Sequence, residues 1–136
     1  MPRACHHRPR PRSGRERGSV TLETAIVYPA ILLAFFAIIQ GGLWFHARNI
    51  ALGAAQEGAR VASAETRGDG AARAAEFIAD AGGADVLTVH RIDQSTSTAA
   101  ATVTVTVTGH SLSLLPGVDM TVTQSSTAPL KRWTES

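Results

Sequence analysis

The sequence predicts an α+β fold with a single N-terminal transmembrane helix that continues outside the membrane, a second short helix and a small three-stranded antiparallel sheet. Three observations support this prediction. A basic segment precedes a run of 24 uncharged residues, alanine-rich helical stretches follow, and the C-terminal half alternates threonine with valine. The 136 residues leave room for one small domain beside the helix, which excludes a multidomain enzyme.

Residues 1–18 are expected to form a basic, disordered leader on the cytoplasmic side. Only Glu16 opposes six of the chain's twelve arginines here, namely Arg3, Arg8, Arg10, Arg12, Arg15 and Arg17. Positive charge before a membrane segment keeps that end in the cytoplasm, so the C-terminal part is expected on the extracytoplasmic side of the cell membrane. A nucleic-acid-binding arm would also be basic, but this leader has no interleaved aromatic side chains, and we expect no nucleic-acid partner.

Residues 19–47 are predicted to span the membrane as a helix. No formal charge lies within residues 24–47, and at ~1.5 Å per residue a helix of that length covers about 36 Å, enough for a ~30 Å hydrocarbon core. Trp44 and Phe45, followed by an arginine, fit an interfacial anchor at the far end. Pro29 removes one backbone hydrogen bond, so we expect a helix kink there.

A basic end followed by an apolar run also describes a secretory signal peptide, whose removal would release a chain that starts near residue 47. Signal peptidase requires small residues just after the apolar core, whereas bulky Trp44 and Phe45 fill that zone. We therefore favour a helix that stays in the membrane and keep the secreted form as the weaker alternative.

Residues 48–66 are predicted to continue the helix outside the membrane. A stripe of small side chains recurs there at three- and four-residue spacing and consists of Ala51, Ala54, Ala55, Gly58, Ala59 and Ala62. Small side chains allow a close approach, so the stripe packs either on the chain's own sheet or on a neighbouring subunit. Glu57 and Arg60, three residues apart, are expected to form a solvated ion pair.

Residues 70–130 are predicted to form a small α+β extracytoplasmic domain, and residues 131–136 its tail. A second helix is expected over residues 71–81, where apolar side chains share one face and two glycines follow. The Arg-Gly-Asp sequence at residues 67–69 is interpreted as a helix-capping turn, not as an adhesion tripeptide.

Strands are expected over residues 85–93, 101–108 and 118–123, because branched side chains are frequent there and alternate. In the middle strand the valines share one face and the threonines the other, which predicts a meander with one wet face. The last strand is expected to bury Val118, Met120 and Val122.

The connection between the second and third predicted strands is unusually apolar. It carries Leu112, Leu114 and Leu115 where a loop is normally polar. These side chains either fold back under the sheet or contact the bilayer or a partner.

No residue pattern indicates catalysis, metal binding or a cofactor. The five histidines have no His-Glu-x-x-His spacing, and phosphate loops, dinucleotide fingerprints and nucleophile elbows are missing from the sequence. Cys5 is the sole cysteine, which excludes an intramolecular disulfide and a cysteine-based metal site. We expect no enzyme activity, no catalytic residues, no metal, no cofactor and no small-molecule substrate.

A short motif stands at the start of the apolar run. Gly18 and Ser19 precede Glu23, whose carboxylate is costly to place beside a membrane. One interpretation puts Glu23 in the first helical turn, where the helix dipole favours an anion by ~0.3–1 kcal/mol. The other is that a glycine followed five residues later by a glutamate resembles the processing site of type IV prepilins. That resemblance implies cleavage by prepilin peptidase between Gly18 and Ser19, after which Glu23 pairs with the new α-amino group of a neighbouring subunit.

A longer resemblance includes this motif. Residues 18–29, the apolar run and the sequence Ala-Ala-Gln-Glu-Gly-Ala-Arg-Val-Ala at residues 54–62 resemble the TadE-like family of tight-adherence (Flp) pilus assembly proteins, over about residues 17–64. The resemblance implies a pilin-like fold and a membrane-anchored minor pseudopilin or assembly factor. Its implied partners are the membrane, prepilin peptidase, other pilin or pseudopilin subunits and pilus platform proteins.

One residue departs from the pilin pattern. Major pilins of these systems carry an aromatic residue after the glutamate, whereas Thr24 stands here, which argues against a major pilin. The alternative function is a single-pass, membrane-tethered extracytoplasmic binding module that is not part of a pilus.

Overall fold

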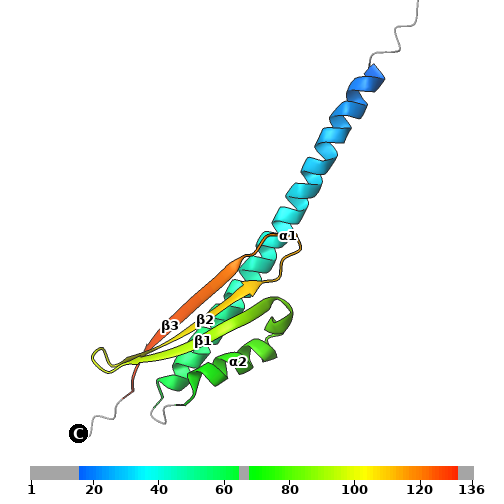
Figure 1. The fold of residues 1–136 in the computed structure, drawn as a ribbon. Helices are drawn as coiled ribbons and strands as arrows, with labels where there is room; N and C mark the ends of the chain where they lie inside the picture. The colour runs from blue at the N-terminus through cyan, green and yellow to red at the C-terminus, as the bar shows by residue number, and fades with distance from the viewer. Residues whose placement is uncertain (1–15, 65–67, 132–136) are drawn as a thin grey trace, which may run out of the picture. The chain divides into compact units, whose positions relative to one another are not determined.

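The computed structural model describes residues 16–64 and 68–131, with side chains from Thr21 onward, and it confirms the predicted α+β fold. Figure 1 shows the elements, which are α1 (Glu16–Ala62), α2 (Gly70–Asp80), the short 3₁₀ helix η1 (Gly83–Asp85), β1 (Leu87–Ser97), β2 (Thr102–Ser111) and β3 (Thr121–Pro129). Most of the predicted leader and tail lie outside the described residues. The chain divides into two units, residues 1–35 and 36–136, which are taken in turn.

The first unit contains the N-terminal part of α1, whose apolar side chains are exposed. Tyr28 is 72% exposed and Leu22 67%, and Ile26, Ile31 and Leu33 are similar. A helix that is apolar on every face is typical of a membrane span. By length and composition, one helix within the described residues can cross a membrane, and it covers residues 21–62. Pro29 lies inside α1, and the kink expected there stays a prediction.

The second unit contains the antiparallel meander predicted from the sequence, with strand order β1-β2-β3. The β1–β2 register shifts between Val89 and Arg91, which leaves His90 at a bulge. All three strands extend beyond the prediction, since β1 runs on to Ser97, β2 to Ser111 and β3 from Thr121 to Pro129. The added residues are mostly polar, so hydrophobic alternation does not reveal them.

The predicted burial in the third strand is partly wrong. Val122 is buried as expected, at 2% exposure, but Met120 is only half-buried and Val118 is 37% exposed. The reason is that both residues precede β3 and belong to the connection from β2, where the two-residue alternation of a strand does not operate.

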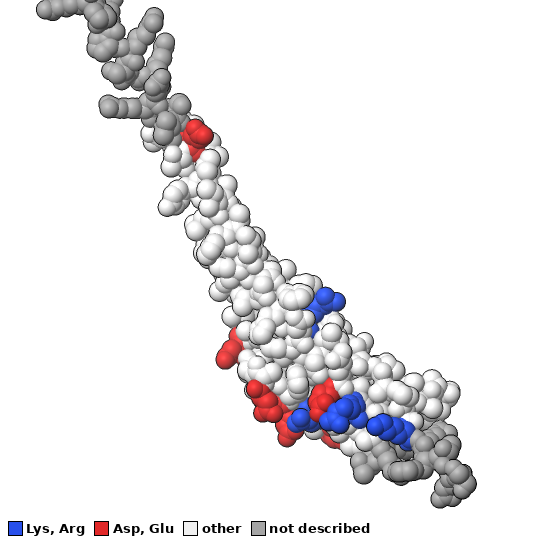
Figure 2. Space-filling model, turned by 180° about the vertical axis from the view of Figure 1, so that it is seen from behind, with Lys and Arg blue, Asp and Glu red and all other residues white. Residues whose placement is uncertain are grey.

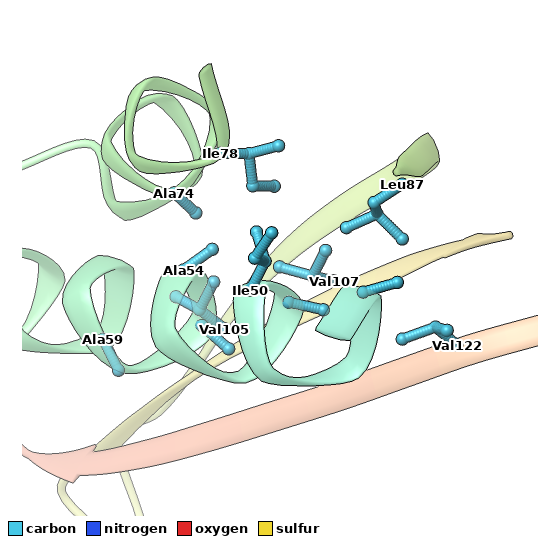
Figure 3. Close-up of a cluster of buried hydrophobic side chains, with 12 residues drawn as sticks. Ile50, Ala54, Ala59, Ala74, Ile78, Leu87, Val105, Val107 and Val122 are labelled. Carbon is cyan, nitrogen blue, oxygen red and sulfur yellow. The ribbon is translucent and has the colours of Figure 1, made fainter. Parts of the chain in front are cut away.

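The core lies between one face of the sheet, α2 and the second-unit part of α1 (Figure 3). Val103, Val105 and Val107 of β2 are fully buried, while the threonines between them face the other side of the sheet. Burying each valine contributes roughly 1.5–3 kcal/mol. The helices supply mainly alanines together with Ile50 and Ile78, so the helix backbones come close to the sheet.

Helix α2 begins and ends within one residue of the prediction. Asp69 caps it, because its carboxylate accepts a hydrogen bond from the Ala72 amide at 3.0 Å. Gly70 donates its amide to Oε1 of Gln94 at 2.8 Å. Gly82 follows the helix in the left-handed conformation with φ 66°, which glycine adopts without strain. The arginine of the predicted capping turn lies outside the described residues.

Candidate functional site

The bond between Gly18 and Ser19 lies inside α1, which begins at Glu16. A protease binds its substrate in an extended conformation, so cleavage at this bond requires local unwinding of the helix. The predicted processing site lies within the first described turn of α1.

Glu23 is exposed one turn further along α1. It lines a shallow surface hollow with Thr24, Val27 and Tyr28. Among the described residues, the ion pairs of the protein all lie in the second unit and do not involve Glu23.

Gln40 holds the loop between β2 and β3 against α1, a role that was not predicted from the sequence. Its side chain is 4% exposed. Its Oε1 accepts a hydrogen bond from the Leu114 amide at 2.9 Å, and its Nε2 donates to the Leu112 carbonyl at 3.2 Å and lies 3.6 Å from the Met120 sulfur. Trp44 adds a bond from Nε1 to the carbonyl of Thr121 at 3.4 Å. A lone amide within a 24-residue uncharged run was the available signal.

The leucines of this loop do not fold back under the sheet. Leu112 is 46% exposed and Leu114 47%, and Leu115 is half-buried. The physical reason is that Gln40 holds the loop through the backbone of Leu112 and Leu114, so their exposed side chains take no part in this contact. Of the two alternatives drawn from the sequence, the first is therefore wrong for Leu112 and Leu114.

The stripe of small side chains lies inside the second unit. Ala51, Ala54 and Ala55 are fully buried, Ala59 is 1% and Ala62 3% exposed, and Gly58 is buried with them. A Cβ added to Gly58 would lie 2.5 Å from the Gly70 carbonyl oxygen and 3.1 Å from Cγ1 of Val105. The stripe thus packs on the chain's own α2 and sheet, and its side chains are not accessible to a neighbouring subunit.

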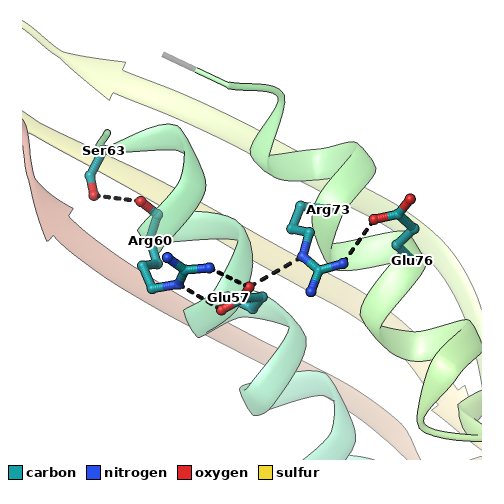
Figure 4. A network of polar contacts seen from close by, with 5 residues as sticks. All are labelled: Glu57, Arg60, Ser63, Arg73 and Glu76. Atoms are coloured by element: carbon teal, nitrogen blue, oxygen red, sulfur yellow. Dashed lines mark hydrogen bonds and ion pairs between the residues drawn. The ribbon is translucent and has the colours of Figure 1, made fainter. Parts of the chain in front are cut away.

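An ionic network joins α1 to α2 (Figure 4). Glu57 accepts hydrogen bonds from Arg60 at 2.7 and 2.8 Å and from Nε of Arg73 at 3.2 Å, and Arg73 also donates to Glu76 at 2.9 Å. Hydrogen bonds from Arg60 and then Arg73 lower the pKa of Glu57 to about 2. The predicted Glu57–Arg60 pair therefore exists, but as part of a larger cluster. Figure 2 shows charged side chains of both signs gathered on one face of the second unit.

A metal site requires histidine, cysteine or acidic side chains that lie close together. Within residues 16–64 and 68–131, no group of three or more His, Cys, Asp or Glu side chains could hold a metal ion. His90 and His110 lie edge to face with their ring centroids 4.6 Å apart, on the paired strands β1 and β2. Their rings make a T-shaped aromatic contact.

Comparison with known proteins agrees with the sequence resemblance. No curated protein and no solved structure matches the chain. A model of the TadE-like protein family matches a segment that begins at Gly18 and includes Glu23, Gln40 and most of the small-residue stripe. Residues 18–60 of this chain match the TadE-like protein family, as their motifs predict.

Proposed function

We propose that the protein is a membrane-anchored minor pseudopilin or assembly factor of a tight-adherence pilus, with a structural role rather than a catalytic one. The observation that carries this proposal is the TadE-like match over residues 18–60. That segment holds the apolar helix, the Gly18–Glu23 motif and most of the buried stripe. The implied partners are prepilin peptidase, other pilin or pseudopilin subunits and the platform proteins of the pilus machinery.

The contacts of Gln40 and Trp44 support a helix that is retained in the mature protein. Both side chains bond to the backbone of the β2–β3 loop or the start of β3. Cleavage by signal peptidase near residue 47 would remove both side chains and leave the loop without these bonds. Retention of the helix keeps the second unit complete.

The orientation of the anchor is part of the proposal. Six arginines precede Gly18, whereas few charged residues follow the apolar run closely. Positive charge is retained on the cytoplasmic side during insertion, which favours a cytoplasmic N-terminus and an extracytoplasmic sheet domain.

The processing step is tested by the N-terminus of the membrane-bound protein. In cells that contain prepilin peptidase, we expect the chain to begin at Ser19, as read by N-terminal sequencing or intact mass. Gly18→Leu is expected to retain Met1, because a bulky Cβ substituent before the scissile bond obstructs an extended fit in the protease cleft. Gly14→Leu is the matched control and should still be processed.

Two results would contradict the proposal at different points. A wild-type chain that keeps Met1 while pili assemble normally would remove the processing step. A mature chain that starts near residue 47 in the medium would remove the membrane-anchored function altogether. Deletion of the gene should reduce surface pili in electron micrographs, and unchanged piliation would favour the membrane-tethered binding module instead.

A further inference from the structure

The loop between β2 and β3 lies beside the second-unit part of α1 (Figure 1) and is apolar. Leu112 and Leu114 are almost half exposed, and Val118 is 37% exposed. No charged residue occurs from residue 94 to residue 118. An apolar, uncharged loop on a protein surface is unfavourable in water and indicates that something covers it.

Several backbone groups of this loop have hydrogen-bond partners within the protein. The Leu112 amide donates to the Val86 carbonyl at 2.8 Å, and the Leu112 carbonyl and the Leu114 amide bind the two ends of the Gln40 side chain. The Val118 amide donates to the Leu115 carbonyl at 3.3 Å. These bonds are compatible with contact to lipid, because lipid cannot replace hydrogen bonds that a backbone group loses on leaving water.

The part of α1 beside the loop has the composition of a membrane interface. In the second unit, Ile38 is 74% and Phe45 56% exposed. The guanidinium of Arg48 lies 5.8 Å from the ring centroid of Trp44. Aromatic side chains followed by a basic residue are typical of the boundary between hydrocarbon and headgroups. The loop is tied to α1 at this level by Gln40 and Trp44.

We propose that the β2–β3 loop, residues 112–118, docks on the phospholipid surface of the outer leaflet and inserts its leucines at the boundary between headgroups and acyl chains. Gln40 is the positioning residue, since it fixes the loop on the helix and satisfies its backbone at the same time. The second-unit part of α1 beside the loop carries exposed apolar side chains at the same level, so one bilayer surface covers both. The inference rests on the membrane anchoring proposed above and adds a second point of attachment to it.

The test uses the full chain with Cys5→Ser, reconstituted in phosphatidylcholine–phosphatidylglycerol vesicles. A polarity-sensitive fluorophore is attached at Leu114→Cys or, as the matched control, at Ala99→Cys in the turn between β1 and β2 at the other end of the sheet. Lipids with a quencher near the headgroup should reduce the fluorescence at position 114 about twofold or more relative to position 99, because interfacial insertion is only ~5–10 Å deep. Adding Gln40→Leu should bring the signal at position 114 toward that of position 99.

Each other outcome has a defined meaning. Release of the chain by alkaline extraction would defeat the membrane anchoring itself. Retention of the chain without lipid quenching at position 114 would defeat only the loop contact, and a crosslink from that position to a second copy or another protein would replace lipid by a protein interface. Quenching that is unchanged in Gln40→Leu would contradict the role of Gln40.

Discussion

Glu57 accepts hydrogen bonds from arginines on two different helices, and its position explains the direction of its pKa. The side chain of Glu57 is 21% exposed, that of Arg73 36% and that of Arg60 68%. Solvent therefore screens the Glu57–Arg60 pair more than the Glu57–Arg73 pair. Exposed ion pairs contribute little to the free energy of folding. Glu57 matters to the structure mainly because its contact with Arg73 joins α1 to α2. Arg73 is the residue that couples α2 to α1 in this network.

The lowered pKa of Glu57 predicts a pH dependence of stability. Its pKa falls from 4.5 to about 2 on folding, so the contribution of its charge is fully present above about pH 4.5 and is lost as the pH falls toward 2. We expect Glu57→Gln to lower the unfolding free energy of the full chain at pH 7 and to have a much smaller effect near pH 2, where much of the carboxylate is protonated in both states. Denaturant titrations followed by circular dichroism measure both values. Glu76→Gln, which affects an outer carboxylate that is 69% exposed, is the control and should have a smaller effect. An equal loss at both pH values would show that the charge of Glu57 is not responsible.

At the scale of elements, α1 and α2 cross where Gly58 faces Gly70. Each glycine leaves no room for a Cβ against the carbonyl oxygen of the other, at 2.5 Å in both directions. Alanines flank this contact on both helices and extend the close approach along the core. The crossing therefore depends on the absence of two side chains.

Gly58→Ala is predicted to destabilise the second unit. The added methyl group overpacks a closed site and should lower the unfolding free energy by about 1–3 kcal/mol in thermal or denaturant unfolding of the full chain in detergent. Gly42→Ala is the matched control in the same helix, since nothing lies within 4 Å of its added Cβ. It should be neutral or slightly stabilising, because alanine favours a helix over glycine by roughly 0.5–1 kcal/mol. Similar effects of both substitutions would contradict the close crossing.

At the scale of the whole molecule, the sequence predicts the elements that have a strong period or composition. The apolar span, the small-residue helix, α2 and the alternating strand β2 are recognised from their residues because the local pattern decides them. The polar end of β1, the start of β3 and the contacts of Gln40 depend on residues more than 70 positions apart or on strand pairing. Such contacts have no local pattern in the sequence. The bond from Arg73 to Glu57 is of the same kind, because it joins residues of two different helices.

The predicted role of Glu23 belongs to assembly, and the ion pairs of the described residues do not include this carboxylate. Glu23→Ala should leave membrane insertion intact and reduce the number of assembled pili, because the carboxylate would no longer pair with the Ser19 α-amino group of a neighbouring subunit in a low-dielectric environment. Alkaline extraction measures insertion, and electron microscopy of surface pili measures assembly. Asp80→Ala, at the exposed end of α2, is the control. Unchanged piliation in Glu23→Ala would reduce the carboxylate to a helix cap.

The strand order leaves β3 at an open edge of the sheet. An edge strand offers unpaired backbone groups to other chains, and many proteins protect such strands with lysines or prolines. No charged residue occurs from Thr121 to Leu130, and Pro129 interrupts the strand only at its end. Within the described residues, β3 therefore has few features that oppose pairing with a strand of another chain. The solubility of the sheet domain away from the membrane then depends on a contact that covers this edge.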